Sequence, residues 1–127
     1  MADARQLRIL LIEDSRTQVA IVREHLRMGF DAPVHMEHDE SLAGGLARLA
    51  QASFDLLLLD LNVTDSAGFD TFLTAKAAAP DLPIVVLTGE EGAAQAVQEG
   101  AHDYIVKGEC TPESLARCIR HAVEHLQ

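Results

Sequence analysis

The sequence has 127 residues, which suits one domain with a single core and is too short for two. Hydrophobic residues make up 48% of the chain and aromatic residues only 4%, so a disordered chain is excluded and an aliphatic core is expected. The formal charge of -10 repels phosphate backbones and anionic membranes, so direct binding to nucleic acid or to a membrane is not expected.

Short apolar runs alternate with helical patterns along the chain. Buried strands are expected at Leu7 to Ile12, Leu56 to Leu59 and Pro83 to Thr88, with weaker candidates at Val34 to Glu37 and Asp103 to Lys107. Helices are expected at Ser15 to Met28, Ser41 to Gln51, Gly68 to Ala79, a short piece at Ala93 to Glu99, and Thr111 to Leu126. This alternation predicts a doubly wound α/β fold, with a parallel sheet and helices on both faces.

Two helices carry distinctive residues at their ends or centres. Thr111 is expected to cap the last helix, and Pro112 suits its first turn. The second helix contains Gly44 and Gly45, each of which costs about 1 kcal/mol relative to Ala, so tertiary packing must hold that helix. No linker-like or repeated segment divides the chain, which predicts a single domain.

Five polar residues fall where the predicted strands end: Glu13 and Asp14 after the first, Asp60 after the third, Thr88 at the end of the fourth and Lys107 at the end of the fifth. Sheets of this kind bind ligands beyond the carboxyl ends of their strands. Neighbouring carboxylates raise one another's pKa, so this edge calls for a cation, for which Mg2+ is the natural candidate. Lys107 and the Thr88 hydroxyl would then face an anion.

With these residues the chain resembles the receiver domain of two-component response regulators over almost its whole length. The resemblance rests on Glu13-Asp14, Asp60, Gly68 eight positions later, Thr88-Gly89, and the segment GAHDYIVK from Gly100 to Lys107. It implies a flavodoxin-like, five-stranded parallel sheet of order 2-1-3-4-5 flanked by five helices. It also implies a single receiver domain over residues 1–127, with a core of about 6–126 and no output domain in this chain.

The resemblance assigns the chemistry to particular residues. Asp60 would accept a phosphoryl group from a sensor histidine kinase, a phosphotransfer protein or a small donor such as acetyl phosphate. Glu13, Asp14, Asp60 and the backbone carbonyl of Asn62 would bind Mg2+. The metal and Lys107 would offset the charge that develops on the phosphoryl oxygens. The protein would thus be a phosphorylated signalling domain and not an enzyme.

The resemblance also implies a conformational switch and a lifetime for the phosphorylated state. Thr88 would move to the phosphoryl group and Tyr104 would turn inward, which changes the surface seen by an output partner or fused domain. Asn62 and Glu90 would tune dephosphorylation, and this pair predicts a short-lived phosphoaspartate.

Two departures from the family pattern affect the loops near the site. Thr64 stands where a proline is usual, which indicates a less rigid loop after Asp60. Thr88 and Lys107 are 19 positions apart, a spacing shorter than the family's by roughly one helical turn. The missing turn falls between Glu90 and Glu99, so we expect a short or partly unwound fourth helix.

Two other functions fit parts of the pattern. A pseudo-receiver would use the same fold as a phosphorylation-independent protein-binding module, but the complete set of site residues argues against it. A haloacid-dehalogenase-type phosphatase is suggested by the run from Asp60 to Thr64, but Asn62 replaces the general acid that hydrolysis needs.

The remaining histidines and cysteines are expected to play smaller roles. His121 and His125 have zinc-compatible spacing but fall on the polar side of the last helix, and His35 and His38 lack an obvious third ligand. Cys110 and Cys118 match no zinc spacing and suit reduced thiols in the cytoplasm, where we expect the protein to reside.

Overall fold

The structure, a computed structural model, describes residues 6–89 and 97–125. Its strands are β1 (Leu7–Ile12), β2 (Val34–Asp39), β3 (Leu56–Asp60), β4 (Ile84–Thr88) and β5 (Asp103–Val106). Its helices are α1 (Arg16–Gly29), α2 (Leu42–Gln51), α3 (Phe69–Ala78) and α5 (Pro112–His125), with a short 3-10 turn at Lys107–Glu109. The predicted fourth helix lies largely outside the described residues, and so does most of the segment in which we expected a shortened helix.

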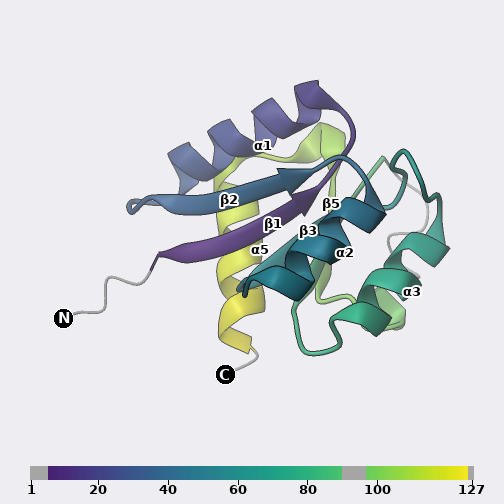
Figure 1. Ribbon diagram of the computed structural model, residues 1–127. Helices are drawn as coiled ribbons and strands as arrows, with labels where there is room; N and C mark the ends of the chain where they lie inside the picture. Colours follow the sequence, from purple (N-terminus) through teal and green to yellow (C-terminus); the bar gives the residue numbers. More distant parts are fainter. Residues whose placement is uncertain (1–5, 90–96, 126–127) are drawn as a thin grey trace.

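The five strands form one parallel sheet in the order β2-β1-β3-β4-β5, which confirms the predicted fold class and strand order. Helices α1 and α5 cover one face of the sheet, and α2 and α3 cover the other (Figure 1). The order places β1 and β3 side by side in the centre, so the crossover connections run in opposite directions from them. This is the position at which such sheets hold their ligands.

Alternation along the central strands gives the sheet two hydrophobic cores. Ile9 and Leu11 of β1 pack toward α1 and α5, whereas Leu10 and Ile12 pack toward α2 and α3. The leucines of β3 divide in the same way, and all four are fully buried. The apolar run before Asp60 is therefore a strand buried on both faces, as its sequence predicted.

Side-chain caps set where the helices begin. Ser15 Oγ accepts a hydrogen bond from Gln18 N, and Ser41 Oγ accepts one from Gly44 N. Thr111 Oγ1 accepts one from Ser114 N, which confirms the cap predicted for the last helix. The boundaries otherwise differ from the predicted ones by a few residues, mainly in β2, which continues to Asp39.

The glycine pair of α2 allows a close approach between that helix and the sheet. A Cβ atom on Gly45 would overlap the side chain of Ile12, and one on Gly44 would overlap the carboxylate of Asp39. The two glycines lower the helix propensity of α2, but they allow α2 to pack closely over the ends of β1 and β2.

Candidate functional site

The site lies at the carboxyl ends of the strands, because parallel strands all end at the same edge of the sheet. Glu13 directly follows β1, Asp60 is the last residue of β3, and Thr88 is the last residue of β4. All three are almost inaccessible to solvent. Lys107 follows β5, and the structure brings it to the carboxylates of Glu13 and Asp60.

Lys107 is the cation that joins the two buried carboxylates. Its Nζ lies 2.9 Å from Asp60 Oδ2 and 3.0 Å from Glu13 Oε1. Burial lowers the pKa of Lys107, but its hydrogen bonds to Asp60 and Glu13 outweigh burial and leave the pKa raised. The ammonium group is therefore charged at neutral pH and is held directly beside Asp60.

Glu13 is fully buried and holds a proton more tightly than an ordinary glutamate. Burial, together with hydrogen bonding to Asp60, raises the pKa of Glu13 to about 7. Its Oε2 accepts a hydrogen bond from Ser15 N at 3.1 Å. Its other oxygen, Oε1, is buried, and its partner is the ammonium group of Lys107, 3.0 Å away. A buried carboxylate oxygen of this kind is suited to a cation.

Three carboxylates converge at this edge of the sheet. Glu13, Asp14 and Asp60 each offer an oxygen, and these oxygens lie within 4.8 Å of one another. Glu13 and Asp60 are buried, whereas Asp14 is exposed, so the group opens to solvent on one side. Oxygen ligands at this spacing fit a hard divalent cation such as Mg2+, which retains several of its waters. The residues present therefore fit the ion that the sequence predicted.

The loop after Asp60 folds back on the carboxylate. Asn62 N donates to Asp60 Oδ1 at 3.1 Å, and Asn62 Oδ1 accepts a hydrogen bond from Gly68 N at 3.0 Å. Gly68 has a φ of 77°, a conformation that favours glycine and that permits the tight entry into α3. Val63 and Ser66 exchange backbone hydrogen bonds, so the loop closes on itself.

Two residues that hold the site loops were missed by the sequence analysis. Asp65 accepts hydrogen bonds from Leu42 N at 2.7 Å and Ala43 N at 3.0 Å, at the start of α2. His38, which we had considered only as a metal ligand, lies with its Nε2 2.7 Å from the carbonyl oxygen of Glu13. The two contacts of Asp65, with one between Thr64 Oγ1 and Glu40 O at 3.3 Å, hold the loop that lacks a proline, whereas His38 holds the backbone after β1.

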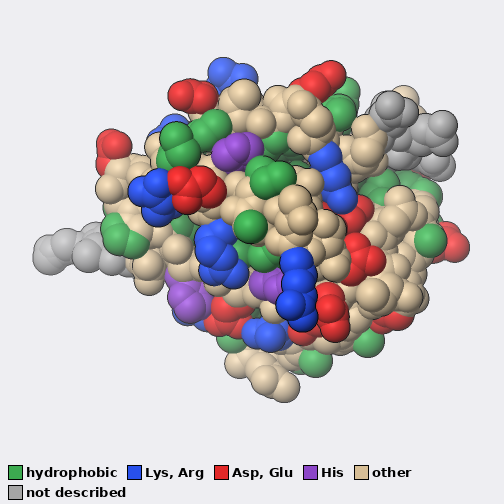
Figure 2. Space-filling model, turned by 90° about the horizontal axis from the view of Figure 1, so that it is seen from above, with side chains coloured by type: hydrophobic (Ala, Val, Ile, Leu, Met, Phe, Trp, Pro, Cys, Tyr) green, Lys and Arg blue, Asp and Glu red, His purple; other side chains and the backbone are tan. Residues whose placement is uncertain are grey.

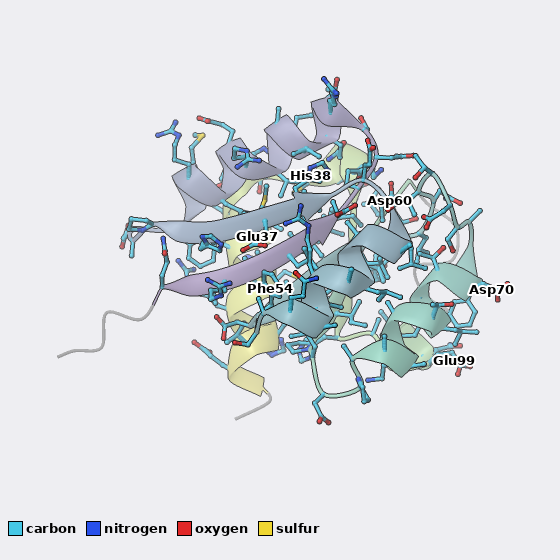
Figure 3. The ribbon with its side chains drawn as sticks, in the orientation of Figure 1. Glu37, His38, Phe54, Asp60, Asp70 and Glu99 are labelled. Atoms are coloured by element: carbon cyan, nitrogen blue, oxygen red, sulfur yellow. The ribbon has the colours of Figure 1, made fainter. Side chains whose placement is uncertain are left out.

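Figure 3 shows that His38 and Asp60 both lie at the end of the sheet toward which the strand arrows point. Tyr104, the second predicted switch residue, is 42% exposed on β5 in this structure. Glu90, predicted to tune dephosphorylation, lies outside the described residues.

The other candidate ligands lie elsewhere. His35 pairs with Glu37, and the ring of His121 contacts that of His102 edge to face. The side chain of His125 is outside the described part of the structure. Within that part, Glu13, Asp14 and Asp60 form the one group of three acidic, His or Cys side chains close enough together to bind a metal ion.

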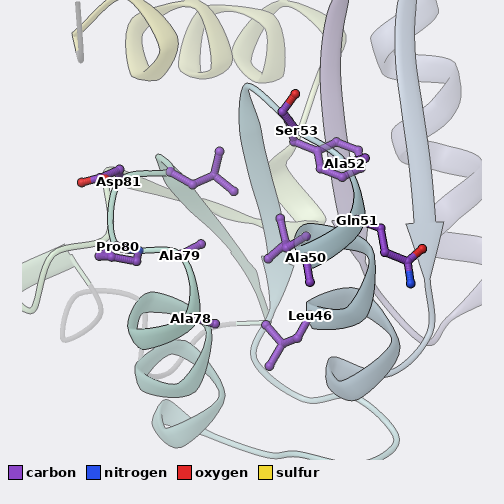
Figure 4. Close-up of a pocket in the computed structure, with 12 residues that line it drawn as sticks. Leu46, Ala50, Gln51, Ala52, Ser53, Ala78, Ala79, Pro80 and Asp81 are labelled. Atoms are coloured by element: carbon purple, nitrogen blue, oxygen red, sulfur yellow. The ribbon is translucent and has the colours of Figure 1, made fainter.

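A groove of about 730 Å³ opens at the opposite end of the sheet, between the carboxyl ends of α2 and α3 (Figure 4). Leu46, Phe54, Ala78 and Leu82 are among its lining residues, and none of the predicted site residues reaches it.

On the face seen in Figure 2, basic and acidic side chains lie next to one another, so no field of a single sign covers it. Among the described residues, no helix is both long and apolar enough to cross a membrane.

A parallel sheet of order 2-1-3-4-5 with an acidic cluster and a lysine at its carboxyl edge is the arrangement expected of a receiver domain. The comparison with protein families agrees with this class. The model of the response regulator receiver domain matches residues 9–120, and the chain belongs to this family.

The curated relatives that match this chain are longer regulators. The chain is 27% identical over 120 residues to the regulatory protein LuxO of Vibrio cholerae and 32% identical over 117 residues to the alginate biosynthesis transcriptional regulatory protein AlgB of Pseudomonas putida. These alignments cover 89% and 90% of the chain but only 25% of each relative. The chain thus spans about a quarter of the length of these regulators.

Solved structures show the same fold. A CheY-like receiver domain from Methanospirillum hungatei superposes with a TM-score of 0.82 at 22% identity and covers 96% of this chain and 97% of that chain. The Vibrio cholerae chemotaxis protein CheY4 superposes with a TM-score of 0.78 at 24% identity and covers 93% and 99%. At these identities the likeness concerns the fold alone.

Proposed function

We propose that this receiver domain accepts a phosphoryl group on Asp60 in a reaction that depends on Mg2+, and that phosphorylation changes its surface to control an output partner or fused domain. The observation that carries the proposal is the group around Asp60: the carboxylate lies 2.9 Å from Lys107 Nζ, beside the carboxylates of Glu13 and Asp14. This places positive charge and cation ligands around one oxygen nucleophile.

In the transfer step, a carboxylate oxygen of Asp60 forms a bond to phosphorus while the bond from phosphorus to the donor breaks. With phosphohistidine the leaving imidazole nitrogen takes the electron pair, and with acetyl phosphate acetate leaves. Lys107 neutralises charge on the phosphoryl oxygens, and the buried Thr88 hydroxyl is positioned by β4 to bind them. Mg2+, when bound, supplies further neutralisation of the same charge.

Glu13, Asp14, Asp60 and the carbonyl of Asn62 are the proposed protein ligands of the ion. After transfer, Thr88 moves to the phosphoryl group and the exposed Tyr104 turns inward. These movements link the site to the surface of β5.

Asn62 and Glu90 tune hydrolysis, and their pairing favours a phosphoaspartate that is lost quickly. This is tested by removing the donor and following phosphate release in Mg2+ buffer. A half-life of many hours would contradict it.

The proposed donor is a sensor histidine kinase or phosphotransfer protein, and the proposed location is the cytoplasm, where such kinases present their phosphohistidine. A single receiver domain over residues 1–127 accounts for the whole of this chain.

Incubation with acetyl phosphate and Mg2+, beside Asp60→Asn, tests the central proposal by intact mass. We expect one added phosphoryl group on the parent, and none on the variant or on the parent in excess EDTA. A parent protein that stays unmodified while a partner still binds would instead favour the pseudo-receiver.

A further inference from the structure

Two loops carry the proposed cation ligands, and these loops are also connected to each other by hydrogen bonds through a third segment. One loop follows β1 and carries Glu13 and Asp14. The other follows β3 and carries Asn62. A third segment, residues 38–43, runs from the end of β2 to the start of α2, and we call it the β2–α2 turn. Both ligand loops are hydrogen-bonded to it.

On one side the β2–α2 turn holds the backbone of Glu13. His38 Nε2 lies 2.7 Å from Glu13 O, and because a carbonyl oxygen can only accept, this ring nitrogen carries the hydrogen. Glu13 N in turn donates to Asp39 O at 3.0 Å. Both backbone polar groups of Glu13 are therefore fixed by β2, which leaves little freedom for its buried carboxylate.

On the other side the turn is held by Asp65, five positions after Asp60. Its two carboxylate oxygens accept from Leu42 N and Ala43 N, the first amides of α2. The third amide of that first turn, Gly44 N, donates a hydrogen bond to Ser41 Oγ. Amides at a helix start lack partners within the helix and favour a negative charge, so the Asp65 carboxylate is stabilised there, which agrees with its lowered pKa.

The turn itself is held rigid between these two contacts. Asp39 Oδ1 accepts from Ser41 N at 3.1 Å, and Asp39 Oδ2 accepts from Arg48 Nε at 3.0 Å. An unbroken series of hydrogen bonds thus runs from the loop after Asp60, through α2 and β2, to Glu13.

We propose that the β2–α2 turn sets the separation of the two ligand loops, and that His38 and Asp65 are positioning residues for binding of Mg2+. Neither residue belongs to the group of carboxylates that would hold the ion. This inference deepens the proposed function and rests on it for the identity of the ion. The reason for an effect on affinity is that a cation with strict geometry binds weakly when its ligands must first be brought together.

The test measures Mg2+ binding by calorimetry on the unphosphorylated protein, with Asp65→Asn and His38→Leu. We expect each variant to raise the Mg2+ dissociation constant by about tenfold or more, as loss of a partner behind a metal ligand does. His38→Gln, which keeps an N–H donor, should restore most of the affinity. Hydrogen exchange of the Leu42 and Ala43 amides should speed up in Asp65→Asn.

Two matched controls separate this role from a loss of charge or of a ring. Asp70→Asn removes an equally exposed carboxylate at the first turn of α3, where Figure 3 shows it away from α2. His35→Leu removes a half-buried histidine of the same strand that pairs with Glu37. Both controls should bind Mg2+ within about twofold of the parent if the positions, and not the residue types, matter.

Phosphorylation by acetyl phosphate gives a second readout. In Asp65→Asn the Mg2+ concentration for half-maximal rate should rise, while the limiting rate at saturating Mg2+ stays close to that of the parent. A variant that only unfolds more easily would instead keep the parent's Mg2+ affinity and show a lower melting temperature.

The outcomes distinguish the two proposals. If the parent binds Mg2+ but takes no phosphoryl group, the proposed function fails and calorimetry still tests the role of the turn. If Asp65→Asn and His38→Leu bind Mg2+ as tightly as the parent, or if the parent binds none, the inference is overturned.

Discussion

Lys107 Nζ lies 2.9 Å from Asp60 Oδ2, although the two residues are 47 positions apart in the chain. Asp60 is the last residue of β3 and Lys107 is the residue after β5, and β4 lies between these two strands in the sheet. The cation paired with the proposed nucleophile therefore comes from the far side of β4.

Replacing this lysine by a neutral residue of similar length should slow phosphorylation. For Lys107→Met we expect the rate with acetyl phosphate at saturating Mg2+ to fall by about tenfold or more, because a charge aimed at the transferring group is lost. Lys76→Met is the control, since Lys76 lies in α3 and its Nζ donates a hydrogen bond to the carbonyl oxygen of Pro80. An unchanged rate in Lys107→Met would remove this lysine from the proposed mechanism.

The pKa of about 7 at Glu13 predicts how the stability of the metal-free protein depends on pH. The folded protein retains a proton on Glu13 that the unfolded chain loses near pH 4.5, so folded stability should fall as pH rises from about 4.5 through 7. Between pH 5 and 8 this one group should account for about 2 kcal/mol.

Urea unfolding in EDTA at several pH values, compared with Glu13→Gln, isolates this contribution from that of the histidines. The free energy of unfolding of the parent, relative to that of Glu13→Gln, should fall as the pH rises. In Mg2+ the loss of stability at high pH should shrink, because the ion replaces the proton as partner of the carboxylate. A difference that grows in the opposite direction would mean that Glu13 is ionised in the folded metal-free protein.

Substituting Gly45 by alanine should destabilise the protein, against the usual preference of helices. A Cβ there overlaps the Ile12 side chain, and overpacking of this kind costs about 1–3 kcal/mol, more than the gain in helix propensity. At Gly108 a Cβ has nothing within 4 Å, so Gly108→Ala should be close to neutral. Urea denaturation followed by circular dichroism measures both, and equal stabilities would refute the packing argument.

The two thiols should differ in reactivity. Burial, with the Asp103 carboxylate beside it, raises the pKa of Cys118 to about 12, so very little thiolate forms at pH 8. Cys118 should resist iodoacetamide in the native protein and react in urea. The half-buried Cys110 should react first, as peptide mass mapping would show.

The sequence predicted the sheet, and with it the meeting of Glu13, Asp60 and Lys107, because residues at the carboxyl ends of parallel strands necessarily share one edge. It did not predict the contacts of Asp65 or His38. These join positions 23 and 25 apart through loop conformations, and no periodic pattern encodes them.

The glycines of α2 illustrate a second limit. Their cost to the helix is visible in the sequence, but the close approach to Ile12 and Asp39 that explains them exists only in three dimensions. The short spacing between Thr88 and Lys107 likewise indicated a missing turn, yet the part of the chain that would test it lies largely outside the described residues.

The pairing of α1 with α5 has a consequence for the order of folding. The layer formed by α2 and α3 comes from one contiguous stretch, residues 42–78, and can assemble on β1 and β3 early. The opposite layer needs α1 to meet a helix nearly the whole chain away, where Arg120 Nη2 reaches the carbonyl of Gly29 and its guanidinium lies over the ring of Phe30. During synthesis on the ribosome, the apolar side of α1 stays without its final partner until the last helix has emerged.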